Sequence, residues 1–346
     1  MPATLAAVIG KIISPLPAVA AWWVAVVLLW LVSLLLIVRA LNSDPKLKKT
    51  FFVALFSLGV IESALGIMQF ALQHSLGLSL LGEPVADSST LGVAKVVAYG
   101  EKLLRPFGTF PHSNVLGGYL LVCFVALLSR FRSRSTRNPL LIQITTGLIS
   151  LGIFFTYSRS SWVGFLLVVT IFLFRDGMGF LLRPALLSLG ACLLLFGPSV
   201  GSRFVLSEQS AQLEVRSLGI SSAIEAVKSL PLGTGIRGFI PYLVDEHPDL
   251  PAYSYQPVHN SFLLVVAEVG PFGFFLLLLS LISLTCLRKV KKMWFLPVFA
   301  LLPLLFLDHY LVTLSQGLGI LSLYCVLIRV PREGRGYIHN LFLNKT

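Results

Sequence analysis

Long apolar runs separated by short clusters of lysine and arginine restrict the fold of this chain more than any other feature. Of its 346 residues, 56% are hydrophobic and 12% are charged. The mean hydropathy of +0.86 is that of a membrane protein. A window of about 19 residues predicts about nine transmembrane helices. We expect them at Ala18–Val38, Thr50–Leu72, Val115–Leu128, Leu140–Tyr157, Trp162–Phe174, Leu186–Val200, Asn260–Leu287, Met293–Leu307 and Thr313–Ile328.

The basic clusters predict the orientation of these helices. If every span crosses once, the clusters that begin at Arg39, Arg130, Arg175, Arg288 and Arg329 all fall on one side. By the positive-inside rule this side is the cytoplasm. The other side receives two long loops, residues 74–114 and 201–259, which carry most of the unusual polar residues. The sequence therefore predicts an all-α, polytopic helical bundle, a single membrane domain over residues 1–346, whose large external loop carries short helices.

Composition argues against several other classes of protein. The net charge of +12 does not indicate a nucleic-acid-binding protein, because the basic residues lie between apolar runs and not on one soluble face. The four cysteines lie in separate apolar segments, so we expect neither a disulfide framework nor a zinc site. We expect no cofactor and no metal ligands. No internal repeat supports an inverted-repeat transporter.

The stretch TYSRSSWVG places Arg159 before a short span. Thirteen residues, Trp162–Phe174, make about 20 Å of helix against a hydrocarbon core of about 30 Å. Arg159 is therefore expected below the headgroups, where it needs a polar cavity or an ion-pair partner. The alternative is an interfacial arginine that reaches headgroup phosphates.

The second external loop contains a predicted helix that begins near Ser207 and ends before Pro231. At helical spacing, the apolar residues Leu213, Ile220, Ile224 and Val227 form one arc, and Arg216 falls inside it. A guanidinium on that face can bind a carboxylate or phosphate with two hydrogen bonds. The alternative is an arginine whose stem packs while its head reaches water.

His259 directly precedes the Asn260–Leu287 span, with Asn260 or Ser261 available as the N-cap. The positive end of the helix dipole disfavours a protonated imidazole at this position. A neutral histidine can accept a proton, as a general base must. The alternative is a structural histidine at the start of a helix.

Four further residues are candidates for supporting roles: Asn114, Glu62, Glu268 and Asp308. Asn114 lies in LRPFGTFPHSNVLGGYL, together with Arg105 and a glycine pair that permits close helix approach. Glu62 and Glu268 lie inside predicted spans, where a carboxylate pairs with a cation or stays protonated. Asp308 belongs to a short polar turn between two spans.

Four stretches together resemble the O-antigen ligase and polymerase family of bacterial membrane glycosyltransferases. They are TFPHSNVLGGYL, TYSRSSWVGFLL, an arginine ahead of AIEAVKSLPLGTGIRGF, and HNSFLLVVAEVGPFG. The resemblance implies a GT-C-like fold. It also implies transfer of a glycan from an undecaprenyl pyrophosphate carrier to an acceptor hydroxyl, at the outer face of the bacterial inner membrane and without a metal.

The same resemblance implies roles for individual residues. Arg159 and Arg216 match arginines that bind the pyrophosphate of the carrier, and Arg105 matches a motif arginine before GTFPHSN. His259 matches a histidine that activates the acceptor hydroxyl. Because pyrophosphate is a good leaving group, such an enzyme must mainly offset negative charge and position the hydroxyl for in-line attack.

Three functions remain open at this point. The chain is a ligase or a polysaccharide polymerase, or a protein O-oligosaccharyltransferase that uses the same donor. In a polytopic transporter or flippase, by contrast, Glu62, Arg159 and Glu268 would be relay or substrate-binding charges. The expected partners are the lipid-linked glycan, a hydroxyl of a glycan, lipid or protein, and the bilayer, with no nucleic acid.

Overall fold

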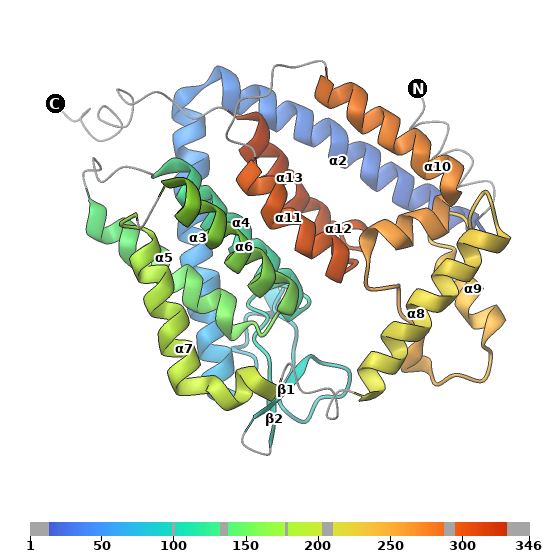
Figure 1. Cartoon of the computed structure of the whole chain (residues 1–346), viewed down its shortest axis with the longest axis horizontal. Coiled ribbons are helices and arrows are strands. Elements are labelled where there is room, and N and C mark those ends of the chain that lie inside the picture. The colour runs from blue at the N-terminus through green and yellow to red at the C-terminus, as the bar shows by residue number, and fades with distance from the viewer. Residues whose placement is uncertain are drawn as a thin grey trace. The chain divides into compact units, whose positions relative to one another are not determined.

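The computed structural model describes residues 14–98, 101–131, 138–176, 179–202, 210–286 and 295–330. These residues fold mainly as helices, with one small β-hairpin (Figure 1). In chain order the elements are α2 (Pro17–Ser43), α3 (Pro45–Leu72), η1 (Ser79–Leu81), β1 (Lys95–Ala98), β2 (Glu101–Leu104), α4 (Ser113–Arg130), α5 (Pro139–Phe155), α6 (Arg159–Asp176), α7 (Leu182–Ser202), α8 (Ser210–Ser229), α9 (Phe239–Glu246), η3 (Ala252–Ser254), α10 (Ser261–Cys286), α11 (Phe295–Leu307), α12 (Tyr310–Thr313) and α13 (Ser315–Arg329).

The helical class and the membrane character predicted from the sequence are confirmed. A helix lies at each predicted span, and by length and composition α2, α3 and α4 can cross a membrane. Five of the other helices, α5, α7, α10, α11 and α13, contain shorter apolar stretches. Nine crossings and a GT-C architecture therefore stay predictions. Most residues of the basic clusters that begin at Arg130, Arg288 and Arg329 fall in residues 132–137, 287–294 and 331–346, which lie outside the described residues.

Two elements differ from the prediction. Strands β1 and β2 form an antiparallel hairpin in the first predicted external loop, with Lys95 opposite Leu104. Val96 and Leu104 of this hairpin are buried. Helix α6 begins at Arg159 and has 18 residues, so it is longer than the expected thirteen-residue span. Because the helix is longer, its length no longer argues that Arg159 is recessed below the headgroups.

The described chain divides into two compact units, which we describe separately. The first unit combines Met1–Ser33, Gln209–Lys292 and Leu305–Leu318. The second unit combines Leu34–Glu208, Met293–Leu304 and Gly319–Thr346. A single membrane domain over the whole chain stays a prediction.

In the first unit, helix α10 is broken at Gly270, whose φ of 71° is left-handed, and at Pro271. Pro271 has no N–H, so the carbonyl of Ala267 loses its helical partner. The loop after α8 replaces it, because the N–H of Thr234 donates to the Ala267 carbonyl at 2.9 Å. The N–H of Gly235 donates to the next carbonyl, that of Glu268, also at 2.9 Å. The loop after α8 therefore supplies the backbone donors for the two carbonyls that the break in α10 leaves without helical partners.

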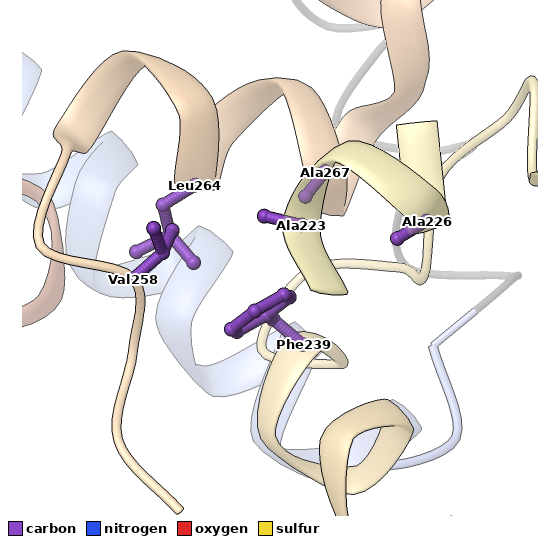
Figure 2. Close-up of a cluster of buried hydrophobic side chains, with 6 residues drawn as sticks. All are labelled: Ala223, Ala226, Phe239, Val258, Leu264 and Ala267. Carbon is purple, nitrogen blue, oxygen red and sulfur yellow. The ribbon is translucent and has the colours of Figure 1, made fainter. Parts of the chain in front are cut away.

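Small residues bring α8 close to α10 (Figure 2). The buried cluster consists of Ala223, Ala226, Phe239, Val258, Leu264 and Ala267. The apolar arc predicted for α8 is therefore wrong in detail, since Ile220 and Ile224 are 43% and 41% exposed. The buried stripe follows Gly219, Ala223 and Ala226. Arg216 precedes Gly219 by three positions and continues this stripe, so its place on the inner face is retained.

In the second unit, α4 packs closely against the turn between α5 and α6. Ser158 directly precedes α6, and its carbonyl accepts the first hydrogen bond of the helix from the N–H of Trp162 at 2.9 Å. A Cβ on Gly117 of α4 would lie 2.5 Å from the Ser161 Oγ and 3.0 Å from the Thr156 Oγ1. The close helix approach predicted for the glycine pair is confirmed at Gly117.

We expect Gly317→Ala to lower the free energy of unfolding by about 1–3 kcal/mol, as overpacking typically does. A Cβ at this position would overlap the Tyr310 carbonyl and lie 2.8 Å from the Leu311 Cα, both in backbone that cannot rotate away. Gly319 is the matched control on the same helix, since a Cβ there would meet nothing within 4 Å. Thermal unfolding of the two variants in detergent measures the difference. Equal unfolding temperatures would contradict the packing described for α12.

Candidate functional site

His259 occupies the last turn of chain before α10. Asn260 is the N-cap of this helix, because its Oδ1 accepts from the N–H of Leu263 at 2.9 Å. Val258 is 1% exposed and fixes the other flank of the histidine. The Nε2 of His259 lies 3.4 Å from the Oε1 of Gln256. The sequence prediction of a capped helix directly after His259 is confirmed.

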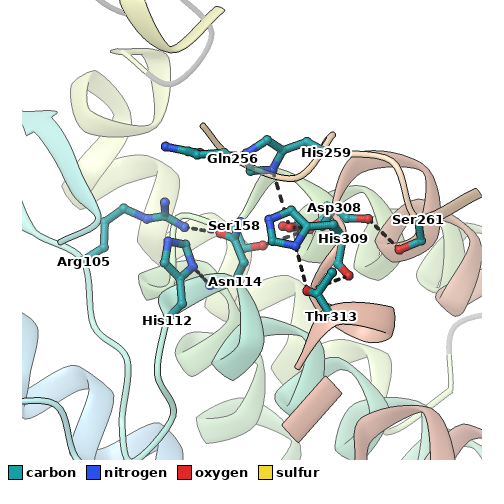
Figure 3. Close-up of polar contacts among 11 residues, drawn as sticks. Arg105, His112, Asn114, Ser158, Gln256, His259, Ser261, Asp308, His309 and Thr313 are labelled. Carbon is teal, nitrogen blue, oxygen red and sulfur yellow. Dashed lines mark hydrogen bonds and ion pairs between the residues drawn. The ribbon is translucent and has the colours of Figure 1, made fainter. Parts of the chain in front are cut away.

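Asp308 and His309 form the turn between α11 and α12 and lie beside His259 (Figure 3). The Nδ1 of His259 is 3.7 Å from the Oδ1 of Asp308, and the two imidazole rings are 5.0 Å apart. The hydroxyl of Ser261 donates to the Asp308 carbonyl at 2.8 Å, which joins the start of α10 to this turn. Asp308, predicted only as a supporting residue, is therefore the acidic neighbour of the candidate base.

Hydrogen bonds fix the tautomer of His309. The hydroxyl of Thr313 donates its proton to the His309 carbonyl at 3.1 Å. The Thr313 Oγ1 also lies 2.8 Å from the Nδ1 of His309, and while the hydroxyl donates to the carbonyl its oxygen accepts from an N–H there, which assigns the proton to Nδ1. The Nε2 of the neutral ring then has a free lone pair.

Burial lowers the pKa of His309 from its ordinary 6.5 to about 4. The Asp308 carboxylate opposes this shift, whereas His259, Arg216 and Arg237 add to it. His309 is thus a neutral imidazole at physiological pH, held among positive charges. Arg216 and Arg237 therefore add positive potential at this imidazole, and the Asp308 carboxylate offsets part of it.

Arg216 is half-buried on α8 and contributes to the electrostatic field at His309. Its neighbours on the buried stripe are Gly219 and Ala223, which pack inward. The prediction that its guanidinium faces the protein body and not the solvated charges is consistent with this position. Its role as a pyrophosphate ligand stays a prediction.

Arg237 is a residue of this site that was not singled out from the sequence. Its backbone is left-handed, with a φ of 62°, and its side chain donates to the Thr313 carbonyl at 2.9 Å. The guanidinium carbon lies 4.1 Å from the centre of the Trp23 ring. Burial lowers the pKa of Arg237, and the Glu268 carboxylate opposes the shift. Its position in the motif GIRGF was the signal that could have identified it.

Glu268 is attached to the same loop. Its carboxylate accepts hydrogen bonds from the backbone N–H groups of Arg237 and Phe239. The side chain therefore fixes α10 to the segment that carries Arg237, and the arginine supplies the cationic partner expected for a carboxylate at this depth. The structure gives it a supporting position and no contact with His259.

A second polar group lies in the second unit, around Arg105. This arginine is 5% exposed, and its Nε donates to the Thr156 carbonyl at 2.9 Å. One terminal nitrogen donates to the Oδ1 of Asn114 at 2.7 Å. Both of these acceptors are neutral, and they orient the guanidinium. The supporting role of Asn114 stays a prediction.

Arg159 and Glu62 belong to the second unit as well. Arg159 is the first residue of α6 and is half-buried, next to the buried serines 158, 160 and 161. A helix N-terminus with an arginine is a favourable place for a phosphate group. Glu62 is held by Thr109, whose N–H and hydroxyl donate to the two carboxylate oxygens at 3.0 and 2.5 Å.

Residues 144–278 match the family model described as O-Antigen ligase. These residues belong to the O-antigen ligase family. The resemblance drawn from the four motifs is confirmed for this segment, which includes Arg159, Arg216, His259 and Glu268. No curated protein and no solved structure matches the chain.

Five site residues lie outside the O-antigen ligase segment: Glu62, Arg105, Asn114, Asp308 and His309. His309 was not predicted as a site residue. Its signal was the polar sequence DHY between two apolar runs, which the sequence analysis assigned to a turn. In the first unit, Asp308 and His309 lie beside His259, which is a histidine of the matched segment.

We expect the imidazole of His309 to stay neutral from pH 8 to near pH 4. The unfolded chain binds this proton near pH 6.5 and the folded chain only near pH 4. Stability must therefore decrease as the pH falls from about 6.5 toward 4. Histidine NMR titration, assigned with His309→Gln, measures the midpoint, and the variant should show a shallower loss of stability over this range. A midpoint near 6.5 would contradict the buried environment.

Proposed function

We propose that this chain is an inverting, metal-independent glycosyltransferase of the O-antigen ligase or polysaccharide polymerase type. It moves a glycan from an undecaprenyl pyrophosphate carrier to an acceptor hydroxyl at the outer face of the bacterial inner membrane. The observation that carries this proposal is the pair formed by His259 and Asp308, with 3.7 Å between Nδ1 and Oδ1. The match of residues 144–278 to the O-antigen ligase family supports it independently.

His259 acts as the general base in this reaction. The Asp308 carboxylate stabilises a proton on Nδ1, which leaves Nε2 to accept the proton of the acceptor hydroxyl. In this tautomer Nε2 carries no proton for the Gln256 Oε1, which lies 3.4 Å away, so the acceptor hydroxyl takes the place of this amide when it binds. As the proton moves to Nε2, the hydroxyl oxygen forms a bond to the anomeric carbon. The bond from that carbon to the pyrophosphate oxygen breaks, and the carrier leaves as its pyrophosphate.

Arginines offset the charge of the departing pyrophosphate. Arg216 is proposed as one ligand, because it faces inward on α8 and adds positive potential at His309. Arg159 is proposed as a phosphate ligand because it combines a guanidinium with the N-terminus of α6. Arg105 is proposed as a third ligand, because its buried guanidinium is oriented by the Thr156 carbonyl and the Asn114 Oδ1. Asn114, Glu62 and Glu268 support these side chains by position.

We expect His259→Ala to lower glycan transfer by about 10²–10⁴-fold, the usual contribution of a general base. The assay uses purified protein and a labelled undecaprenyl-pyrophosphoryl glycan, and it measures release of the carrier pyrophosphate when acceptor is added. His247→Ala is the matched control, because His247 also lies in the first unit but bonds to Ser222. Undiminished transfer in His259→Ala would refute the assignment of the base.

The same assay separates the proposal from its alternatives. Transfer to a serine- or threonine-containing protein, and not to a glycan or lipid hydroxyl, would make the chain a protein O-oligosaccharyltransferase. Absence of transfer to every acceptor, combined with passage of the lipid or a small solute across liposomes, would identify a transporter.

We expect a cysteine at position 217 to react with a membrane-impermeant reagent from outside, and one at position 134 to react only after the membrane is opened. The positive-inside rule predicts these sides. Ser217 is exposed and adjoins Arg216, whereas Arg134 belongs to a basic cluster outside the described residues. The experiment uses Ser217→Cys and Arg134→Cys in a chain whose four cysteines are replaced by serine. The reverse pattern of labelling would contradict an external site.

A further inference from the structure

Three potential metal ligands converge in the first unit, although the sequence predicted no metal site. His259, Asp308 and His309 each offer one ligand atom, and these atoms all lie within 4.8 Å of one another. Two protein ligands of a tetrahedral zinc ion stand about 3.4 Å apart, given bonds of about 2.0–2.1 Å. The 3.7 Å between the His259 Nδ1 and the Asp308 Oδ1 is close to that separation.

In His309, the nitrogen that is not hydrogen-bonded to Thr313 is Nε2, and this atom carries the lone pair of the neutral ring. The Thr313 Oγ1 accepts a hydrogen bond from the protonated Nδ1, so Nε2 is the nitrogen that can bind a cation. A hydrogen bond on the far nitrogen is also the usual way in which proteins orient a metal-binding histidine. Thr313 thus supplies the outer support that such a ligand requires.

His259 presents a second electron pair in one of its two tautomers. Its Nδ1 is buried and has no hydrogen-bond partner among the described residues. When Nε2 carries the proton and donates to the Gln256 Oε1, the lone pair of Nδ1 faces the Asp308 carboxylate. Two lone pairs and the Asp308 carboxylate, whose Oδ1 also accepts from the His309 N–H at 3.0 Å, then lie around one region, where a cation would be attracted to all three groups.

We propose that His259, Asp308 and His309 bind one divalent transition-metal ion of the zinc class, which inhibits the enzyme by occupying its base. Three protein ligands leave the fourth tetrahedral position to water. The bound ion replaces the proton on Nδ1 of His259 and holds Nε2 in its protonated form, so this nitrogen cannot accept a proton from a hydroxyl. The inhibitory part of this inference rests on the proposed function, whereas binding of the ion does not.

The ligand set selects the kind of cation. Two of the three ligands are neutral imidazoles, which favour zinc, nickel, copper and cobalt over magnesium and calcium. Arg216 and Arg237 add positive potential at His309. That potential disfavours hard cations, which bind by charge to several oxygens, more than ions that form coordinate bonds to nitrogen.

Titration of the purified full-length protein with cobalt chloride tests the site. We expect one Co²⁺ per chain, a visible absorption band of tetrahedral cobalt, and displacement by zinc but not by magnesium. His309→Gln and Asp308→Asn should each weaken Co²⁺ binding by at least ~100-fold, the upper end of the cost of losing an outer support. His247→Ala should bind as the unchanged protein does. Thermal unfolding checks that the variants are folded.

Absence of the cobalt band, or equal affinity in His309→Gln and the unchanged protein, would overturn the metal site. In the transfer assay, zinc should inhibit the unchanged protein and a chelator should restore it. Zinc that binds without inhibition would overturn the inhibitory role. If the protein transfers glycan in a His259-dependent way but binds no cobalt, the metal site is refuted and the proposed function stands. If the protein binds cobalt but transfers no glycan, the proposed function is refuted and the metal site stands.

Discussion

The position of His259 depends on how the chain replaces the hydrogen bond that Pro271 cannot make. In an apolar surrounding, a carbonyl without a donor costs several kcal/mol, so a proline inside a membrane helix needs a substitute. Here the N–H groups of Thr234 and Gly235 donate to the carbonyls of Ala267 and Glu268. The Glu268 carboxylate accepts from the backbone of the same loop. The first turns of α10, which follow directly from His259, are therefore held by a segment more than twenty residues earlier.

This attachment also brings charge to the histidines. The loop that completes α10 carries Arg237, and Arg237 reaches the Thr313 carbonyl, on the helix that follows His309. The Ser261 hydroxyl binds the Asp308 carbonyl from the other side. Asp308 and the helix after His309 are thereby held by hydrogen bonds that end on backbone carbonyls. Such fixation limits reorganisation when charge develops during a reaction, which is the main source of electrostatic catalysis.

Periodic hydropathy was sufficient to locate the helices, because each predicted span was long and uninterrupted enough to give a clear signal. It could not give the buried face of α8. Ile220 and Ile224 dominate any apolar arc, but the face that packs is formed by Gly219, Ala223 and Ala226, whose value lies in small size. His259 and Asp308 were both identifiable as residues, yet they are 49 positions apart. Their pairing depends on tertiary contacts that no local pattern contains, and so does the tautomer of His309.

The break in α10 has a consequence for how this sequence can change over generations. Thr234 and Gly235 contribute their main-chain N–H groups, so the donor function itself does not restrict which side chains stand there. Position 235 is restricted by its backbone instead, because its φ is 86° and a Cβ there would overlap the Ser14 Cα. A residue that replaced Pro271 would regain an N–H that competes for the Ala267 carbonyl. Pro271 and the loop LPLGTGIRG should therefore change together during evolution. In a descendant without the proline, the loop would no longer be held by these hydrogen bonds, and Arg237 would lose its position beside the Thr313 carbonyl.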